Sequence, residues 1–428
     1  MSTVKNLFFS VLTVCIVLIG HAQDKEYAKK CIKKLSSNSL HGRGYVKKGS
    51  EKAAKFIANQ FEDIGLLAFE SGYFQPFNFS VNSFPGKMKL EIDGHKLDSG
   101  YDFLISANSP GIKGEFPVHL LSSFSSKENL LKTIDSYKKD FVLVIDKSQF
   151  TNLSLDEKKE FSTLLFTIQN FGYGKVRAIV ELTTEKLTWS GSTKLVELPK
   201  FIIQKEKVHI DESSLLYFNV QHKFHSDYKG DNVIAYLPGD RSDSVLLVTA
   251  HYDHLGRMGR KSIFPGANDN ASGVSMMLNL AKELKAENRK YDIVFIAFAG
   301  EEIGLLGSAY FVDHPIVDLR RIKFLVNLDL AGTGDDGIRI VNGTIYKEQF
   351  KKIQQLNKEK GLLTAVKNRG ASCNSDHCHF HAKNVPSFFI YTLGGIKAYH
   401  DVYDRYETLP LTEYDDYFVL LKGFIQSL

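Results

Sequence analysis

Residues 245–269, VLLVTAHYDHLGRMGRKSIFPGAND, form the stretch around which the rest of the sequence is arranged. It begins as an apolar run of strand length and then releases His251, Asp253 and His254 into a basic, glycine-containing loop. It ends at Asp269, directly before an apolar pattern with helical spacing. Open α/β sheets present their ligands at the carboxyl ends of strands. The stretch therefore predicts a buried strand with a functional site at its end.

Strand and helix patterns alternate on both sides of this stretch. Apolar runs predict further strands at residues 232–237, 293–298, 324–330 and 385–391. Helical patterns separate them, the clearest of which begins near Gly273. Strands that alternate with helices are typical of a parallel sheet covered on both faces. We therefore expect an α/β fold, with a mostly parallel mixed sheet and helices on both faces.

The pattern changes between about residues 85 and 215. Short alternating or apolar runs, such as FVLVID and KVRAIVEL, predict strands there, with one helical stretch among them. Histidines and acidic residues hardly cluster in this part of the chain. We predict that residues 85–215 form a smaller β-rich inserted domain without metal ligands. Residues 23–84 and 216–428 then form the main domain as a discontinuous unit.

The first residues indicate export. One lysine precedes an apolar run from Leu7 to Gly20, and the small residue Ala22 follows, which predicts a signal peptide over residues 1–22. The run is short for a membrane span, so we expect a periplasmic or extracellular protein without stable membrane insertion. The net charge of +5 is spread along 428 residues, which argues against a nucleic-acid partner. No pattern indicates the oligomeric state.

Candidate metal ligands gather after the predicted strands and before the first long helix: His251, Asp253, Asp269, Glu301, Glu302, Asp329 and His400. Taken singly, each has an ordinary structural explanation, such as a solvated acidic pair or a helix cap. Asp329, however, lies inside the apolar run VNLDLAG, where a buried carboxylate needs a compensating charge. Carboxylates and imidazoles without thiolates are the ligand set of a hydrolytic zinc site.

Five motifs in this order resemble metallopeptidase family 28, the two-zinc aminopeptidases: AHYDHLG, GANDNASG, AGEEIGLLGS, NLDLAGT and YHDVYDRYET. The resemblance covers about residues 231–428. The inserted segment is similar, on weaker grounds, to the protease-associated domain that many family members carry. The resemblance implies a zinc-dependent exopeptidase, most simply an aminopeptidase acting on peptides, with two zinc ions per chain.

The same resemblance implies a role for each candidate residue. Five positions match zinc ligands: His251, Asp269, Glu302, Asp329 and His400. Asp269 would bridge the two ions, His251 and Asp329 would complete one site, and Glu302 and His400 the other. Three further positions match an orienting carboxylate, a general acid/base and an oxyanion-stabilising tyrosine, in that order: Asp253, Glu301 and Tyr399.

Three alternatives share this scaffold. A glutaminyl cyclase binds a single zinc ion, whereas the presence of His251 together with a bridging Asp269 favours two. A receptor-like binding protein would have lost ligands, whereas this chain retains all five and the base. Carboxypeptidase specificity remains open, because the metal motifs do not determine which peptide terminus is recognised. The histidines of the segment SDHCHFH, residues 375–381, are not expected to be ligands.

Three cysteines remain after residues 1–22 are removed: Cys31, Cys373 and Cys378. We predict a disulfide between Cys373 and Cys378, with Cys31 unpaired, because an exported protein meets oxidising conditions. A ring this short closes only if the loop turns tightly, and it should act locally. The alternative is a Cys-His zinc site that uses Cys378 with His377 or His379.

Overall fold

Strand β11 (Arg241–His251) lies inside an eight-stranded sheet that forms the main domain. The structure is a computed structural model that describes residues 24–428, and the predicted signal peptide lies outside the described residues. Reading across the sheet, the strands are β1 (Phe74–Ser83), β10 (Lys223–Leu237), β14 (Tyr291–Phe298), β11, β15 (Ile322–Asp329), β18 (Ser387–Thr392), β16 (Ile338–Val341) and β17 (Val366–Asn368). The pairs β14–β11, β11–β15, β15–β18 and β16–β17 are parallel. The pairs β1–β10, β10–β14 and β16–β18 are antiparallel. The expected mostly parallel mixed sheet is therefore confirmed.

Helices cover both faces of this sheet, because successive strand residues point to opposite sides. One face packs Val248 and Phe295 against the larger group of helices: α1 (Lys25–Leu35), α2 (Gly49–Ile64), α5 (Gly273–Lys285), α7 (Lys347–Lys360) and α9 (Tyr414–Ser427). The other face packs Leu247 and Ile296 against α6 (Leu306–Asp313) and α8 (His377–Ala382). Within residues 24–428, no helix is both long and apolar enough to cross a bilayer.

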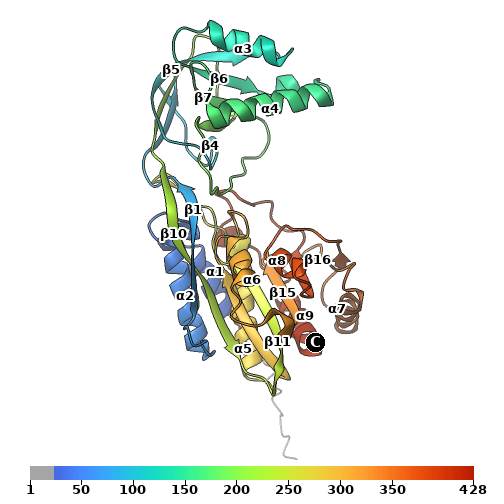
Figure 1. Cartoon of the computed structure of the whole chain (residues 1–428). Helices are drawn as coiled ribbons and strands as arrows, with labels where there is room; N and C mark the ends of the chain where they lie inside the picture. Colours follow the sequence, from blue (N-terminus) through green and yellow to red (C-terminus); the bar gives the residue numbers. More distant parts are fainter. Residues whose placement is uncertain (1–23) are drawn as a thin grey trace, which may run out of the picture.

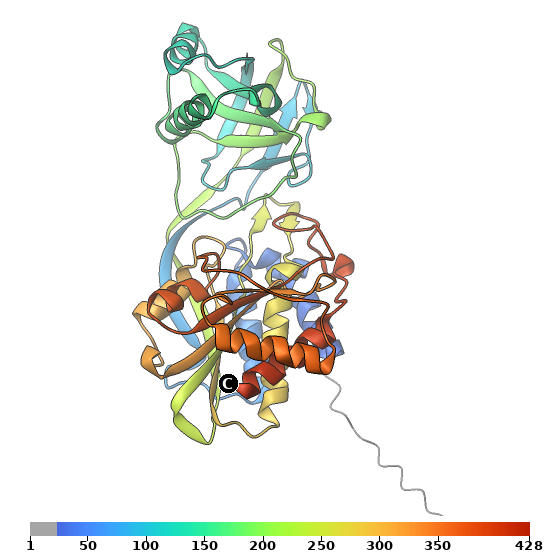
Figure 2. The same cartoon turned by 90° about the vertical axis from the view of Figure 1, so that its right-hand side faces the viewer.

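A second eight-stranded sheet lies above the main domain (Figures 1 and 2). Its strands, in spatial order, are β3 (His95–Lys96), β2 (Met88–Ile92), β9 (Leu215–Val220), β5 (Ile112–Leu121), β6 (Phe141–Asp146), β7 (Val176–Thr183), β8 (Lys200–Gln204) and β4 (Phe103–Ile105). Helices α3 (Lys127–Ser136) and α4 (Leu155–Phe171) pack on it. The main sheet takes no strand from this segment.

Two long strands join the two sheets. β1 leads out of the main domain and β10 returns to it, and the two are paired from Phe74–Val233 to Ser83–Lys223 (Figure 1). The boundary predicted at residue 215 is too early, because β9 pairs with both β2 and β5 in the second sheet. The apolar residues of β9, Leu216 and Phe218, are fully buried in the core of that sheet.

Candidate active site

The candidate residues meet at one edge of the main sheet, where four parallel strands end. His251 and Asp329 are the last residues of β11 and β15. Residues 301–302 follow β14, and His400 lies in the loop after β18. Asp269 reaches the same edge from the turn before α5. Parallel neighbours end at a common edge, which brings together residues far apart in the sequence.

Asp269 lies between two imidazoles. Its Oδ1 is 3.4 Å from His251 Nε2, and its Oδ2 is 3.0 Å from His400 Nε2. His251 Nε2 also lies 3.4 Å from Asp329 Oδ2. His400 Nε2 lies 3.1 Å from Glu302 Oε2. The structure thus brings together all five predicted ligand positions, with each oxygen of Asp269 facing a different histidine.

These side chains fit a divalent metal. Ligand atoms of His251, Glu301 and Asp329 lie within 4.8 Å of one another, as do those of His251, Asp269 and Glu302. Asp329 Oδ1 is buried without a hydrogen-bond partner. Buried carboxylates are costly unless a positive charge compensates them. Oxygen and nitrogen donors without sulfur match the ligand preference of catalytic zinc sites.

The two adjacent glutamates have different surroundings. Glu302 Oε1 lies 2.5 Å from His254 Nδ1, and its other oxygen faces His400. Although burial opposes it, the two imidazoles lower the pKa of Glu302 to about 2. Burial raises the pKa of Glu301 well above its ordinary range, and the neighbouring carboxylates of Glu302 and Asp376 raise it further. The surroundings therefore favour the anionic form of Glu302 and the protonated form of Glu301.

Asp253 connects the end of β11 to the turn after β14. Its carboxylate accepts hydrogen bonds from the Tyr45 hydroxyl at 3.0 Å, the Glu301 amide at 3.1 Å and the Glu302 amide at 3.4 Å. Its backbone oxygen, rather than its carboxylate, lies 3.2 Å from His251 Nδ1. A carbonyl oxygen only accepts, so His251 Nδ1 donates this bond and Nε2 faces the site. The main-chain carbonyl of Asp253 thus orients His251. Its carboxylate orients the turn that carries Glu301 and Glu302.

Tyr399 lies at the rim of the site. Its ring stacks on the His400 imidazole with centroids 4.0 Å apart and an angle of 12°. The residue is 45% exposed, so its ring reaches solvent while covering the histidine. Tyr399 therefore contacts the site through its ring, which covers the His400 imidazole.

Three buried residues at the site had no role in the sequence-based prediction. His254 contacts Glu302, and Asp404 accepts hydrogen bonds from the amides of Asn268 and Asp269 at 2.8 and 2.9 Å. Asp376 is fully buried, and burial raises its pKa to about 7. All three stand inside motifs already singled out: AHYDHLG, YHDVYDRYET and SDHCHFH. Their closeness in the sequence to the predicted ligands is the signal that could have identified them.

Arg43 is a fourth residue that sequence reasoning missed, and no motif marks it. Its side chain is fully buried and donates hydrogen bonds only to backbone carbonyls: Leu35, Tyr252, Pro265, Gly266 and Asp269. Burial lowers the pKa of Arg43 to about 10. The guanidinium therefore ties the N-terminal segment to both ends of the loop between His251 and Asp269.

Replacing Arg43 with methionine is expected to lower the free energy of unfolding by at least about 3 kcal/mol, because several buried carbonyls lose a charged donor. Urea unfolding followed by circular dichroism measures this loss. The matched control is Arg320→Met, because the side chain of Arg320 is 90% exposed. That variant should stay within about 0.5 kcal/mol of the parent protein. Equal stability of both variants would contradict a structural role for Arg43.

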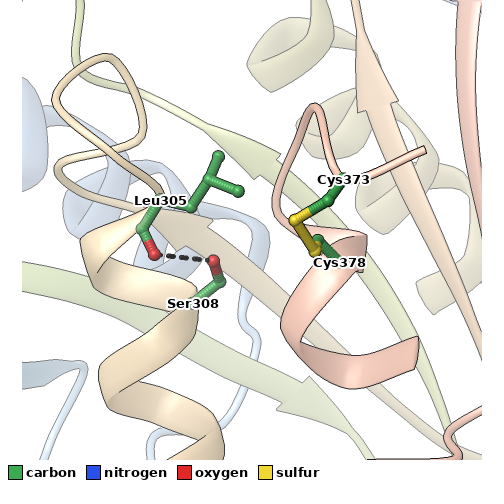
Figure 3. Close-up of a disulfide and its surroundings, with 4 residues drawn as sticks. All are labelled: Leu305, Ser308, Cys373 and Cys378. Carbon is green, nitrogen blue, oxygen red and sulfur yellow. Dashed lines mark hydrogen bonds between the residues drawn. A yellow bond between two sulfur atoms is a disulfide. The ribbon is translucent and has the colours of Figure 1, made fainter. Parts of the chain in front are cut away.

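The predicted disulfide between Cys373 and Cys378 is confirmed, with Cα atoms 4.8 Å apart. It lies beside the start of α6, where the Ser308 hydroxyl donates to the Leu305 carbonyl at 3.1 Å (Figure 3). Cys31 is unpaired and 1% exposed. The bridge excludes the alternative Cys-His zinc site.

A thiol count of the mature protein is expected to give no reactive thiol in the native state and one after denaturation without reductant. Cys31 is buried in the core, and burial raises its pKa to about 12, which disfavours the reactive thiolate. Ellman's reagent, added before and after denaturation, measures both values. Three thiols in the denatured, unreduced protein would contradict the disulfide.

Comparison with known proteins identifies relatives for the main domain. The sequence model of peptidase family M28 matches residues 232–424. Aminopeptidase YwaD of Bacillus subtilis is 47% identical over 148 residues, which cover 33% of this chain and 31% of the relative. A probable leucine aminopeptidase of Arthroderma otae is 29% identical over 226 residues, covering 50% of this chain and 60% of the relative. The chain thus matches less than two thirds of the length of either relative.

Solved structures match nearly the whole chain. BSAP, a zinc aminopeptidase from Bacillus subtilis, superposes with a TM-score of 0.70 at 22% identity, covering 94% of both chains. An aminopeptidase from Aneurinibacillus sp. strain AM-1 superposes with a TM-score of 0.62 at 19% identity, covering 95% of this chain and 94% of the other. At these identities the comparison establishes a common fold.

Proposed function

We propose, on the premise that residues 232–424 match the sequence model of peptidase family M28, that the chain is an exported zinc aminopeptidase that removes N-terminal residues from peptides. The observation that carries this proposal is the position of Asp269 between His251 and His400, with each oxygen facing one imidazole. Such an arrangement suits a carboxylate shared by two metal ions. The predicted signal sequence at residues 1–22 supports export.

Two overlapping sets of side chains would hold the metal. His251, Asp269 and Asp329 form one set, and Asp269 joins Glu302 and His400 in the other. Bound zinc supplies Lewis-acid polarisation of the scissile carbonyl and of the attacking water. His254 and Asp253 keep the second set in place, because they contact the side chain and the backbone of Glu302.

Glu301 is the proposed general base and acid. It lies beside His251 and Asp329, but no imidazole of residues 24–428 is in hydrogen-bonding contact with it, unlike Glu302. Burial raises its pKa well above the ordinary range, which brings the carboxylate closer to the pH at which proton transfer is most efficient. It takes a proton from the attacking water and delivers it to the departing amine. Tyr399, at the rim, is proposed to donate a hydrogen bond to the oxyanion.

A panel of aminoacyl substrates, N-blocked peptides and C-terminally blocked peptides tests this function. We expect hydrolysis only where a free N-terminus is present, loss of activity after chelation and recovery with zinc. Elemental analysis should find two zinc ions per chain. A single ion together with cyclisation of N-terminal glutamine would favour a glutaminyl cyclase. Cleavage that requires a free C-terminus would favour a carboxypeptidase, and zinc binding without any turnover would favour a binding protein.

A further inference from the structure

A segment of the second domain contacts the main domain at the candidate active site. The connection between β7 and β8, residues 184–199, leaves the second sheet and approaches His400. The Trp189 amide donates to the His400 carbonyl at 2.9 Å, and the Trp189 carbonyl lies 3.0 Å from His400 Nδ1. These two contacts bind the main chain and the imidazole of one residue at the same time.

The Trp189 carbonyl determines how the His400 imidazole is used. A carbonyl oxygen only accepts, so His400 Nδ1 carries the proton of this hydrogen bond. Nε2 is then the nitrogen that faces Asp269 and Glu302, at 3.0 and 3.1 Å. Partners of this kind orient metal-binding histidines and fix their tautomer. Here the partner belongs to the second domain.

Lys186 secures the loop that carries His400. Its ammonium group donates to the carbonyls of Lys397 and Tyr399 at 2.8 and 3.0 Å and forms an ion pair with Asp401 at 2.6 Å. The Asp401 side chain is only 5% exposed. Its carboxylate also accepts from the Tyr403 amide at 2.8 Å. Lys186 therefore supplies the positive charge opposite a buried carboxylate that shapes this loop.

The same segment also packs against the turn that carries Glu302. A Cβ atom added to Gly191 would lie 3.1 Å from the Glu302 carbonyl oxygen and 2.3 Å from Ile303 Cγ2. The segment is anchored on its other side, because the buried Trp189 indole donates to the Ile105 carbonyl at 2.7 Å within the second domain. Residues 186–191 thus join one domain to two loops of the other.

We propose that residues 186–191, the positioning segment, hold His400 in the orientation required for zinc, so that the second domain completes the metal site. The proposal rests on the proposed function, because it assigns a role at the same zinc centre. Weakening the segment should release the His400 loop while leaving His251 and Asp329 in place. One of the two zinc ions should therefore be lost selectively.

Zinc titration against a chromophoric competing chelator tests the proposal on the full mature chain. For Lys186→Met we expect an affinity for one zinc ion about tenfold or more below that of the parent, with the other ion unaffected. Lys186→Arg, which retains the charge and the donors, should restore binding. Lys194→Met is the matched control, because Lys194 is an exposed lysine of the same connection. It should bind both ions like the parent protein.

Gly191→Ala provides a second, independent disturbance of the segment if Lys186→Met does not fold, as judged by its unfolding transition. It should show the same selective loss of one ion. Parental affinity for both ions in both variants would overturn the positioning role, and so would equal weakening of both ions. Failure of the unaltered protein itself to bind zinc would instead overturn the proposed function, which distinguishes the two results.

Discussion

Glu301→Gln is expected to lower kcat by at least about 100-fold while leaving the zinc content unchanged. The amide keeps the size of the side chain but cannot take a proton from water. Glu301 does not share the imidazole contacts that Glu302 makes with His254 and His400, so its loss should not disturb those contacts. Steady-state kinetics with an aminoacyl substrate and elemental analysis of the same preparation measure the two quantities.

Glu302→Gln is the matched control for this experiment. It makes the same chemical change one residue later, but it removes a charge that faces His400 Nε2 at 3.1 Å. Zinc occupancy and activity should therefore fall together. If both variants lose the same amount of zinc, or if Glu302→Gln alone retains a full complement, the roles assigned to the two glutamates are reversed or shared.

Asp269→Asn is expected to have the broadest effect on the metal centre. Asp269 is 3% exposed, and its carboxylate contacts both His251 and His400. The substitution removes its charge and replaces one carboxylate oxygen with an NH2 group, which does not bind metal. We expect weaker binding of both zinc ions and a fall in kcat/KM of at least about 100-fold, because even indirect partners of a metal contribute 10- to 100-fold.

Metal titration and kinetics, performed on the same sample, test this prediction. Asp240→Asn, an exposed aspartate at the opposite end of β11, is the control and should retain both zinc ions and full activity. Loss of only one ion in Asp269→Asn would show that the carboxylate belongs to a single site. The unfolding transition of the same sample is recorded as well, and it separates loss of metal from general destabilisation of the protein.

If residues 186–191 position His400, the second domain contributes directly to zinc binding. Trp189, Phe201 and Phe218 are buried in a core that the domain shares with four residues of the main domain: Leu255, Met258, Phe264 and Val402. The second domain's hydrogen bonds to His400 come from the connection between β7 and β8 rather than from the sheet. Loops that extend from a rigid scaffold commonly carry function. A folded second domain would then be a requirement for a complete metal site.

The amino-acid sequence by itself determined the main architecture and the candidate ligands. Apolar strands followed by His251, Asp329 and the pair 301–302 predict a functional site, because every strand of a parallel sheet directs its carboxyl end to the same edge. The pairing of Cys373 with Cys378 was also accessible, since only five positions separate them and the loop between them is local. These inferences depend on patterns within short stretches of chain.

Only the tertiary structure showed what holds these residues in place. Arg43 donates to carbonyls of residues up to 226 positions away, and Trp189 accepts from His400 through its main chain, 211 positions away. The domain boundary was misplaced for a related reason, since the strand Leu215–Val220 is assigned by its partners β2 and β5. Every residue offers a backbone carbonyl. A sequence pattern therefore does not show which backbone carbonyl a side chain will contact. The folded structure determines these pairs.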